Sequence, residues 1–340
     1  MSDSVQNRIA VAYRRFAEQE VRGRSALYET LARAIAEDTD LLALLAALPP
    51  PKRQPNLLLA AVRHVAGAPL AWPAFRSTAL ARWNDVSAVM LSRSTQTNEP
   101  ARCATLLPVL ARLPQPLALI EVGASAGLCL LPDRYAYSYG DHIVRPDHAT
   151  ADAPLFPCQA SPTTPLPSTA PRIVWRAGLD LNPLDVNDVE QMAWLETLIW
   201  PEQAERADRL KAAVRIARTD PPRIVCGDLR DDLAKLAAEA PKDATRVIFH
   251  TAVLAYLPTA AERDAFAASV SRLCDCWISN EAPRVLPDVA SRAPADAPVG
   301  RFILAVNGEP VGWTDPHGAA LEWIGAPPPP HPGQLGAIVA

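Results

Sequence analysis

A short run of small residues behind an apolar stretch is the part of this chain best suited to chemistry. The segment EVGASAG at 121–127 directly follows an apolar run that reads as a buried strand. Small residues let the backbone come close to a ligand, and a helix that begins there would present free N–H groups to it. We therefore expect a cofactor-binding turn with contacts from Glu121, Gly123, Ser125 and Gly127.

Two acids at the ends of later predicted strands extend this signal. Asp180 lies in the segment GLDLNP at 178–183, where its carboxylate could accept hydrogen bonds from both hydroxyls of a ribose. Asp228 ends the next predicted strand, where its carboxylate could meet an adenine edge. The turn and the two acids together predict a nucleoside-binding edge of a sheet.

Polar residues that follow two further buried strands are candidates for the chemical step. His250 and Tyr256 occur in the segment FHTAVLAYLP, and the pair Asn280 and Glu281 ends the fifth predicted strand. The carboxyl ends of parallel strands form the edge where such folds bind ligands, so we expect these residues on the acceptor side, with His250, Tyr256 and Glu281 catalytic. His250 could equally be a hydrogen-bonded core residue, and Tyr256 a packing residue.

A dense polar stretch before the first strand predicts the substrate contacts. The segment QTNEPAR at 96–102 lies between apolar helices, which is unusual for a simple linker. We expect Asn98, Glu99 and Arg102 to bind the substrate, with Arg102 holding an anionic group. No His, Cys, Asp or Glu cluster has the spacing of metal ligands, so we expect no metal.

The elements that must position these residues alternate along the chain. Helices with periodic apolar faces separate the apolar strand candidates, which predicts an α/β fold with a doubly wound, mostly parallel sheet. The expected strands are 117–122, 173–175 leading to 179–180, 223–226, 246–249 and 276–279, the expected helices are 188–199, 202–218, 229–239 and 260–273, and a final antiparallel pair is expected at 301–306 and 320–324.

The same patterns divide the chain. Residues 1–95 show only helical periodicity and predict an all-helical accessory domain. Residues 96–325 then form the sheet domain, interrupted by a proline-rich insertion at 141–171, and 326–340 form a flexible tail.

Composition narrows the partners. The 340 residues carry 33 basic and 37 acidic side chains, a net charge of −4, so nothing in the balance attracts the chain to nucleic acid. The longest apolar run, at 41–48, is too short to cross a bilayer, and the six cysteines form no CxxC pair. We expect a cytoplasmic protein that acts on a small molecule, and its oligomeric state stays open.

At this point the chain resembles the class I S-adenosylmethionine (SAM) dependent methyltransferases. Their first motif is an acid, any residue and a glycine-rich turn, and their second strand ends in a ribose-binding acid. The resemblance covers about 114–325 and implies a Rossmann-like sheet with a C-terminal antiparallel pair and SAM as cofactor. It places the turn beside the methionine and ribose part of SAM, Asp180 at the ribose and Asp228 at the adenine. Ser125 replaces the middle glycine of the turn.

The whole chain also resembles a bacterial family of unknown function. The segments RQPNLLLAAV, NEPARC, EVGASAGL, GLDLNPLDV and HTAVLAYL carry this resemblance, which names no substrate. The predicted function is therefore methyl transfer from SAM to an unidentified small-molecule acceptor.

Other functions compete with this one. Residues 123–127 also fit GxSxG, the nucleophile elbow of α/β hydrolases, with Ser125 as nucleophile, Asp288 as acid and His317 or His250 as base. That fold needs antiparallel strands before the elbow, whereas the upstream sequence is helical. The altered turn also suits a SAM- or nucleotide-binding protein without catalysis. A NAD-dependent dehydrogenase fits less well, because the turn lacks GxGxxG spacing.

Overall fold

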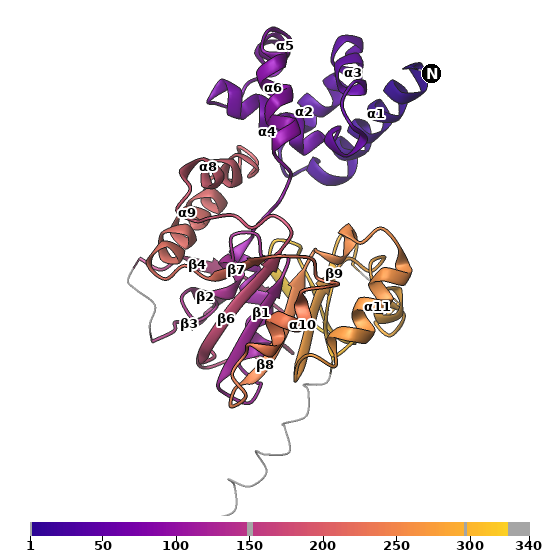
Figure 1. Ribbon diagram of the computed structural model, residues 1–340. Helices are drawn as coiled ribbons and strands as arrows, with labels where there is room; N and C mark the ends of the chain where they lie inside the picture. Colours follow the sequence, from indigo (N-terminus) through magenta and orange to yellow (C-terminus); the bar gives the residue numbers. More distant parts are fainter. Residues whose placement is uncertain (1, 148–151, 296–297, 326–340) are drawn as a thin grey trace, which may run out of the picture. The chain divides into compact units, whose positions relative to one another are not determined.

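The computed structural model describes residues 2–147, 152–295 and 298–325, and these residues fold into two units (Figure 1). One unit consists of the chain up to Thr97 together with Val189–Asp208. The other consists of Asn98–Asp188 and the chain from Arg209 onward. None of the described helices is both long and apolar enough to span a membrane.

The described residues of the first unit form helices and their connections. Ser25 and Asp38 each accept a backbone N–H at the start of a helix, and Gly67 ends another with a left-handed backbone. The helices are α1 (Ser2–Phe16), α2 (Ala26–Ile35), α3 (Thr39–Ala46), α4 (Pro55–Ala66), α5 (Trp72–Ala81), α6 (Trp83–Ser92) and α8 (Val189–Thr197), with short turns of other helix types at Ala17–Val21 and Pro50–Lys52.

The core of this unit includes side chains from a distant part of the sequence. Trp194 of α8 and Trp200, just after it, pack into the same buried cluster as the N-terminal helices. The sequence assigned a helix at 188–199 to the sheet domain, whereas contacts group Val189–Asp208 with the helical unit. The connection between two neighbouring strands of the sheet therefore passes through the other unit.

The second unit contains a nine-stranded sheet in the order β5-β12-β11-β10-β9-β8-β1-β6-β7. Strand β1 pairs in parallel with β6 and β8, and β6–β7 and β8–β9 are also parallel. This confirms the predicted α/β class with a large, mostly parallel sheet. The strands are β1 (Leu117–Val122), β5 (Gln159–Ala160), β6 (Ile173–Asp180), β7 (Arg223–Cys226), β8 (Thr245–Thr251), β9 (Cys276–Glu281), β10 (Phe302–Val306), β11 (Glu309–Thr314) and β12 (Ala320–Trp323).

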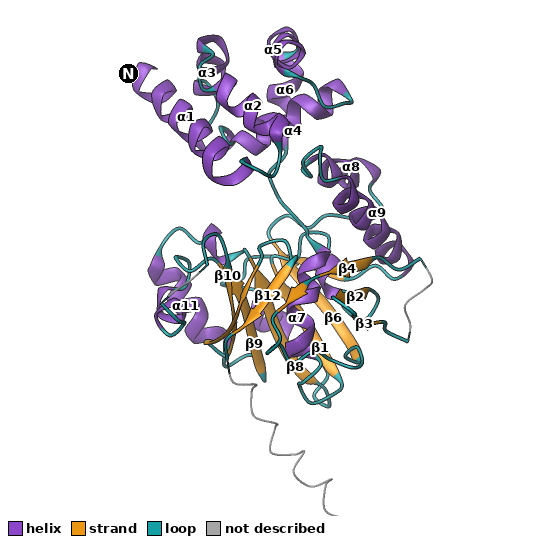
Figure 2. Cartoon of the chain, turned by 180° about the vertical axis from the view of Figure 1, so that it is seen from behind, coloured by secondary structure: helices purple, strands orange, loops and turns teal. Residues whose placement is uncertain are grey.

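Helices cover both faces of the sheet. On one face, α10 (Leu233–Ala238), α11 (Ala260–Val270) and α12 (Pro287–Ser291) contribute to a core cluster with residues of β1, β6, β8 and β9. Figure 1 shows α10 in front of the sheet, and Figure 2, from behind, shows α7 (Cys103–Leu110) on the opposite face. The remaining long helix is α9 (Ala204–Thr219).

The direction of winding reverses at β1, which lies between β6 and β8. The chain leaves β1 to form β6 and β7 on one side, and later forms β8 and β9 on the other side. In open α/β sheets such a switch point opens a crevice at the carboxyl ends of the strands, where ligands bind. The site residues predicted at the ends of β1, β6, β8 and β9 lie in the last residues of these strands or just after them.

Two local predictions were wrong. No α-helix begins after Gly127: a single 3-10 turn at Leu128–Leu130 leads to a small sheet of β2 (Ala136–Tyr139), β3 (His142–Val144) and β4 (Leu155–Pro157). The aromatic rings of Tyr135, Tyr137 and Phe156 pack together there. The interpretation of the turn as a helix N-terminus therefore fails.

The second error concerns the C-terminal strands. Strand β10 pairs with Glu309–Thr314, across a turn at Asn307 and Gly308, and not directly with the strand near 320. A left-handed backbone at both turn residues allows this tight connection. The predicted insertion at 141–171 supplies β3, β4 and β5, apart from 148–151, which lie outside the described residues, as does the predicted tail at 326–340.

Candidate functional site at the carboxyl edge of the sheet

The small-residue turn after β1 is held by hydrogen bonds within the protein. Gly123, Ser125 and Gly127 have φ values of 71°, 54° and 71°, in the left-handed region. The N–H groups of Gly123 and Ala124 donate to the Leu179 carbonyl, and that of Gly127 donates to the Ala124 carbonyl. Most amides of the turn are thus already used and do not form a cradle for phosphates.

A close neighbour explains the first glycine. A Cβ atom on Gly123 would collide with the side chain of Val253, which lies in the loop after β8. This contact gives the glycine a packing role, whereas its predicted contact with a cofactor stays a prediction. The loop after β8 and the turn after β1 are pressed together at the switch point.

The structure brings Asp180 to the turn. Its Oδ2 atom accepts a hydrogen bond of 2.8 Å from the Ser125 N–H, and its Oδ1 atom accepts one of 2.8 Å from the Asn182 N–H. The residue is half-buried. Two candidate cofactor contacts that are far apart in sequence, Ser125 and Asp180, thus form one structural feature.

Asp228 belongs to a surface ion network instead. Its Oδ2 atom lies 2.7 Å from Arg230 Nη2, and Arg230 also pairs with Glu262 at 2.9 Å. The Arg230 side chain holds the pKa of Asp228 below its usual value. These partners account for Asp228 without an adenine.

The segment before α7 is built into the edge of the sheet. Asn98 and Arg102 are both buried, at 7% exposed. Asn98 Oδ1 accepts a 2.8 Å hydrogen bond from the Leu128 N–H, and the Glu99 side chain accepts one from the Ala101 N–H. All three predicted substrate-binding residues are therefore part of the buried edge and not of a loose linker.

Arg102 donates only to uncharged groups. Its Nε atom donates to the Pro316 carbonyl at 2.8 Å, and its Nη1 atom donates to the carbonyl and the Oγ1 atom of Thr251, each at 3.1 Å. No carboxylate of the described residues lies within ion-pair distance of this guanidinium.

Three buried polar atoms near this edge have no hydrogen-bond partner among the described residues: Glu121 Oε2, Ser125 Oγ and Asn280 Nδ2. Glu121 is only 2% exposed, and its burial raises the pKa of its carboxyl well above the usual value. Cys129 and Asp180 raise this pKa further, and Arg102 opposes them. Burial thus favours the neutral form of the Glu121 carboxyl, which can donate a hydrogen bond.

His250 and Glu281 meet on the opposite face of the sheet. His250 is fully buried; its Nδ1 atom lies 2.8 Å from Glu281 Oε1, and its Nε2 atom accepts a 3.0 Å hydrogen bond from Trp277 Nε1. Because Nε2 is the acceptor, the ring proton is on Nδ1 and is donated to Glu281. The same Glu281 oxygen accepts the N–H groups of Val253 and Leu254.

Tyr256 lies at the surface end of that loop, in the 3-10 turn Leu254–Tyr256. The residue is 75% exposed. Desolvation by the surrounding protein raises the pKa of the Tyr256 hydroxyl. The charges of Asp180 and Glu281 raise this pKa further, and the charge of Arg102 lowers it. Tyr256 therefore stands near the charged groups of both faces of the edge.

The hydrolase constellation is not assembled. Ser125 has the left-handed backbone of a nucleophile elbow. Its buried Oγ atom, however, makes no hydrogen bond to any described residue. Both ring nitrogens of His250 are occupied, and His317 follows Asp315 in a turn. Neither proposed base contacts the serine.

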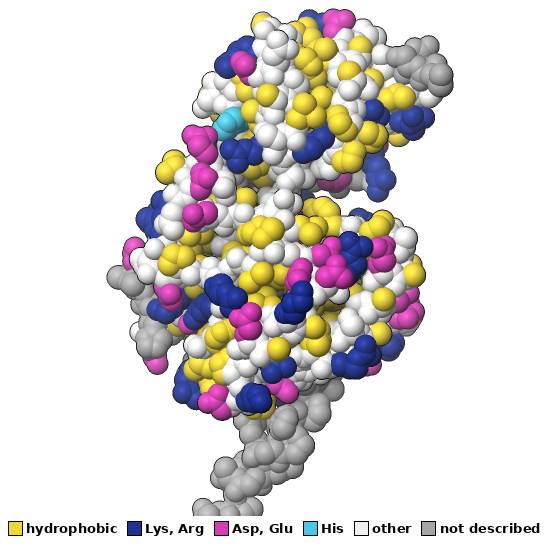
Figure 3. Space-filling view, viewed as in Figure 1, with side chains coloured by type: hydrophobic (Ala, Val, Ile, Leu, Met, Phe, Trp, Pro, Cys, Tyr) yellow, Lys and Arg dark blue, Asp and Glu magenta, His cyan; other side chains and the backbone are white. Residues whose placement is uncertain are grey.

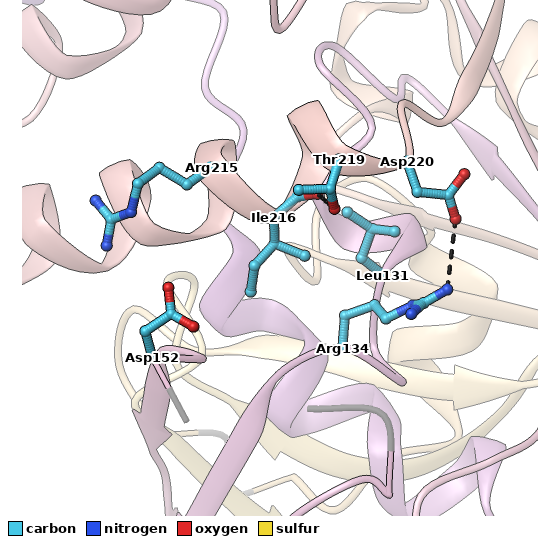
Figure 4. Close-up of a pocket in the computed structure, with 7 residues that line it drawn as sticks. All are labelled: Leu131, Arg134, Asp152, Arg215, Ile216, Thr219 and Asp220. Carbon is cyan, nitrogen blue, oxygen red and sulfur yellow. Dashed lines mark hydrogen bonds and ion pairs between the residues drawn. The ribbon is translucent and has the colours of Figure 1, made fainter. Parts of the chain in front are cut away.

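Sequence reasoning missed a separate pocket of about 200 Å³. Figure 4 shows Arg134 directed toward Asp220, at 3.4 Å, with Arg215 and Asp152 on other sides of the space. The Asp220 side chain is 65% exposed and the Arg134 side chain 34%, and ion pairs so open to solvent contribute little. None of the described residues form a group of three or more potential metal ligands, in this pocket or elsewhere.

Sequence reasoning also missed Thr251 and Thr314, which line the face that carries Arg102. Thr314 Oγ1 donates a 2.7 Å hydrogen bond to Asn280 Oδ1. The strict alternation of strand residues was the available signal, because Thr251 and Asn280 each adjoin a predicted site residue that points the other way.

The fold and this edge define the class: an α/β protein with a mostly parallel sheet whose switch point carries a buried polar cluster. The chain belongs to a bacterial family described as "Uncharacterized protein conserved in bacteria (DUF2332)", which matches residues 10–323. The expected membership of a bacterial family of unknown function is thus confirmed. No curated protein and no solved structure matches the chain.

Proposed function

We propose that the protein is a SAM-dependent methyltransferase that binds the adenosyl part of its cofactor at the carboxyl ends of β1 and β6. One observation carries the proposal: the Asp180 carboxylate lies at the small-residue turn, 2.8 Å from the Ser125 N–H, and remains half-buried. The resemblance to the methyltransferases depends on the same pair of features.

The residues present suit a nucleoside that carries no phosphate. Asp180 is a carboxylate that accepts backbone N–H groups from Ser125 and Asn182, and a carboxylate is the acceptor that ribose hydroxyls need. The turn amides are mostly used within the protein, so a pyrophosphate would find few donors. This difference favours SAM over NAD.

SAM, when bound, supplies a methyl group on a positively charged sulfur. The protein's contribution to such a transfer is mainly alignment of the acceptor with that methyl group. His250 has no free lone pair for a proton, so we infer that it and Glu281 position the loop at 253–256 and, through it, Tyr256. Tyr256, with its exposed ring, remains the candidate for contact with the acceptor.

We also propose that the sheet is of the methyltransferase type. The five adjacent strands β7, β6, β1, β8 and β9, with an antiparallel strand beside β9, support this assignment. Residues 1–95 would then form an all-helical accessory domain. The missing helix after Gly127 and the sequential order of β10, β11 and β12 depart from the expected pattern.

The acceptor and the location are parts of the same proposal. Basic and acidic side chains are interspersed on the face of the sheet unit seen in Figure 3, which supports a small-molecule acceptor over a polyanion. All six cysteines are free thiols, as suits a cytoplasmic protein in a reducing compartment.

Calorimetric titration with SAM, S-adenosylhomocysteine and NAD tests the cofactor. We expect SAM or S-adenosylhomocysteine to bind and NAD to fail. Asp180→Asn should weaken binding by about tenfold or more, since a hydrogen bond to a charged group contributes about 1.5–3 kcal/mol. Asp185→Asn, in the same loop, is the matched control and should bind normally.

Failure of a folded protein to bind either adenosyl compound contradicts the proposal. In that case, labelling by a fluorophosphonate that disappears in Ser125→Ala would favour the hydrolase. Binding of SAM with no methyl transfer to a broad panel of small acceptors would favour a non-catalytic binding protein.

A further inference from the structure

The buried guanidinium of Arg102 has no negative partner in the described parts of the chain. Its hydrogen bonds go to two carbonyls and one hydroxyl, and the residue is 7% exposed. A buried charge is costly unless it is paired and hydrogen-bonded. Its Nη2 atom makes no hydrogen bond to a described residue, so the N–H groups on one edge of the guanidinium are available to an acceptor.

A second donor lies beside it. Thr251, which accepts from Arg102, is the register partner of Asn280 in the parallel pair of β8 and β9. Side chains at partnered positions point to the same face of a sheet, about 5 Å apart. Asn280 uses its Oδ1 atom to accept from Thr314 and keeps its buried Nδ2 donor without a partner.

The two groups share one deficiency, because each is a donor that lacks an acceptor. Glu121 Oε2 is a further buried polar atom without a hydrogen-bond partner, and Arg102 is close enough to Glu121 to lower the pKa of its carboxyl. The Arg102 guanidinium and the Asn280 Nδ2 donor are together complementary to an anion with two acceptor oxygens.

A single guanidinium compensates one negative charge. A phosphate would place up to two negative charges beside a single guanidinium, whereas a carboxylate places one. The planar carboxylate also matches the geometry of a guanidinium edge.

We propose that Arg102 and Asn280 form a binding site for one carboxylate group of a small molecule. The group belongs either to the amino-acid end of the cofactor, a source that rests on the proposed function, or to a second ligand, a source that does not. Both sources present the same chemistry to the protein.

Acetate and two adenosyl compounds separate these sources. S-adenosylhomocysteine carries a carboxylate, and 5′-methylthioadenosine lacks the whole amino-acid end. Calorimetry would compare their binding, and that of acetate against neutral acetamide, in the native chain and in Arg102→Gln. The control is Arg263→Gln, since Arg263 also donates to two carbonyls, those of Val285 and Leu257.

We expect Arg102→Gln to weaken the binding of acetate, of S-adenosylhomocysteine or of both by about tenfold or more. Arg263→Gln should leave both affinities unchanged. Loss of acetate binding alone assigns the site to a second ligand. If the affinity of Arg102→Gln for S-adenosylhomocysteine falls toward its affinity for methylthioadenosine, the site binds the carboxylate of the cofactor. Unchanged affinity for both carboxylates, or native binding of neither, overturns the proposal.

The inference and the proposed function can fail separately. If neither adenosyl compound binds the native chain but acetate binds and depends on Arg102, the carboxylate site stands and the methyltransferase proposal falls. If methylthioadenosine binds while no carboxylate depends on Arg102, only the carboxylate site falls.

A second variant covers the possibility that Arg102→Gln does not fold. Asn280→Asp keeps the shape and the Oδ1 acceptor, but replaces the Nδ2 donor by an oxygen that supplies an internal counter-ion. We expect carboxylate binding to fall by about tenfold or more with no loss of melting temperature. Retained carboxylate binding in this variant contradicts the site.

Discussion

At the scale of single residues, the two predicted acids at the ends of β1 and β9 have different surroundings. Burial raises the pKa of the Glu121 carboxyl, and its Oε2 atom has no hydrogen-bond partner among the described residues. Glu281 accepts hydrogen bonds from two backbone N–H groups and from His250. The same side-chain type therefore has an oxygen without a partner at one strand end and is well hydrogen-bonded at another.

Glu121→Gln should change how stability depends on pH. The folded-state pKa of Glu121 is raised, so the unfolded chain loses this proton first as the pH rises above about 4.3. Native stability then falls with rising pH, by about 1.4 kcal/mol per unit, up to the folded-state pKa. Glutamine has no such proton, so the variant should match the native protein near pH 4 and exceed its unfolding free energy at pH 7.

Urea denaturation across this pH range measures the difference. Glu239→Gln is the opposite control, because the Arg223 side chain lowers the pKa of exposed Glu239. The contribution of ionised Glu239 to the unfolding free energy is present above the pKa of glutamate in the unfolded chain and disappears as the pH falls. A constant difference between native protein and Glu121→Gln at every pH would show that Glu121 is not protonated in the fold.

At the scale of elements, the site depends on two loops that pack against each other. The turn after β1 has a glycine where the Val253 side chain approaches, and the loop after β8 is tied to Glu281 through the N–H groups of Val253 and Leu254. His250 and Trp277 hold Glu281 in turn through a chain of hydrogen bonds. The buried histidine thus acts on the site through loop position.

Gly123→Ala should destabilise the protein by about 2 kcal/mol or more, because its φ of 71° disfavours a side chain and the new methyl group meets Val253. Val253→Ala should relieve the second part of this cost. In a double-mutant cycle by urea denaturation, the combined variant should therefore lose less stability than the two single variants added together. Strict additivity would mean that the loop and the turn do not press on each other.

At the scale of the whole molecule, the helical unit is discontinuous in sequence. Trp200 packs against Phe16 and Tyr28 with ring centroids 6.3 and 6.4 Å apart, and its Nε1 atom donates to Asn56. Trp194 donates to the Ser94 carbonyl. The N-terminal helices therefore complete their core with side chains that the chain supplies only after β6.

Residues 1–97 alone should consequently be poorly stable, because both tryptophan positions in their core would be open. A single chain of 1–97 joined by a Gly/Ser linker to 189–208 should unfold cooperatively and at higher urea concentration, as followed by circular dichroism. Trp200→Ala in the joined chain is the control and should cost about 3–5 kcal/mol. Equal stability of the two fragments would contradict a shared core.

Sequence patterns alone determined the class of the fold and the edge on which the polar residues gather. Continuous apolar runs separated by amphipathic helices specify a parallel sheet, and residues directly after such runs must lie at its carboxyl edge. The positions of Asp180, His250 and Glu281 follow from that rule, whereas the burial of the polar segment around Arg102 was not predicted.

Only the tertiary structure decided which of these residues have partners. Neighbouring strand residues point to opposite faces, so His250 joins Glu281 and Trp277 while Thr251 meets Arg102, and no local pattern states which other elements cover each face. Non-local packing likewise replaced the expected helix after Gly127 and moved Val189–Asp208 into the helical unit. A hydrogen bond forms between groups that the whole fold brings together, which is why the uncompensated charge of Arg102 became visible only in three dimensions.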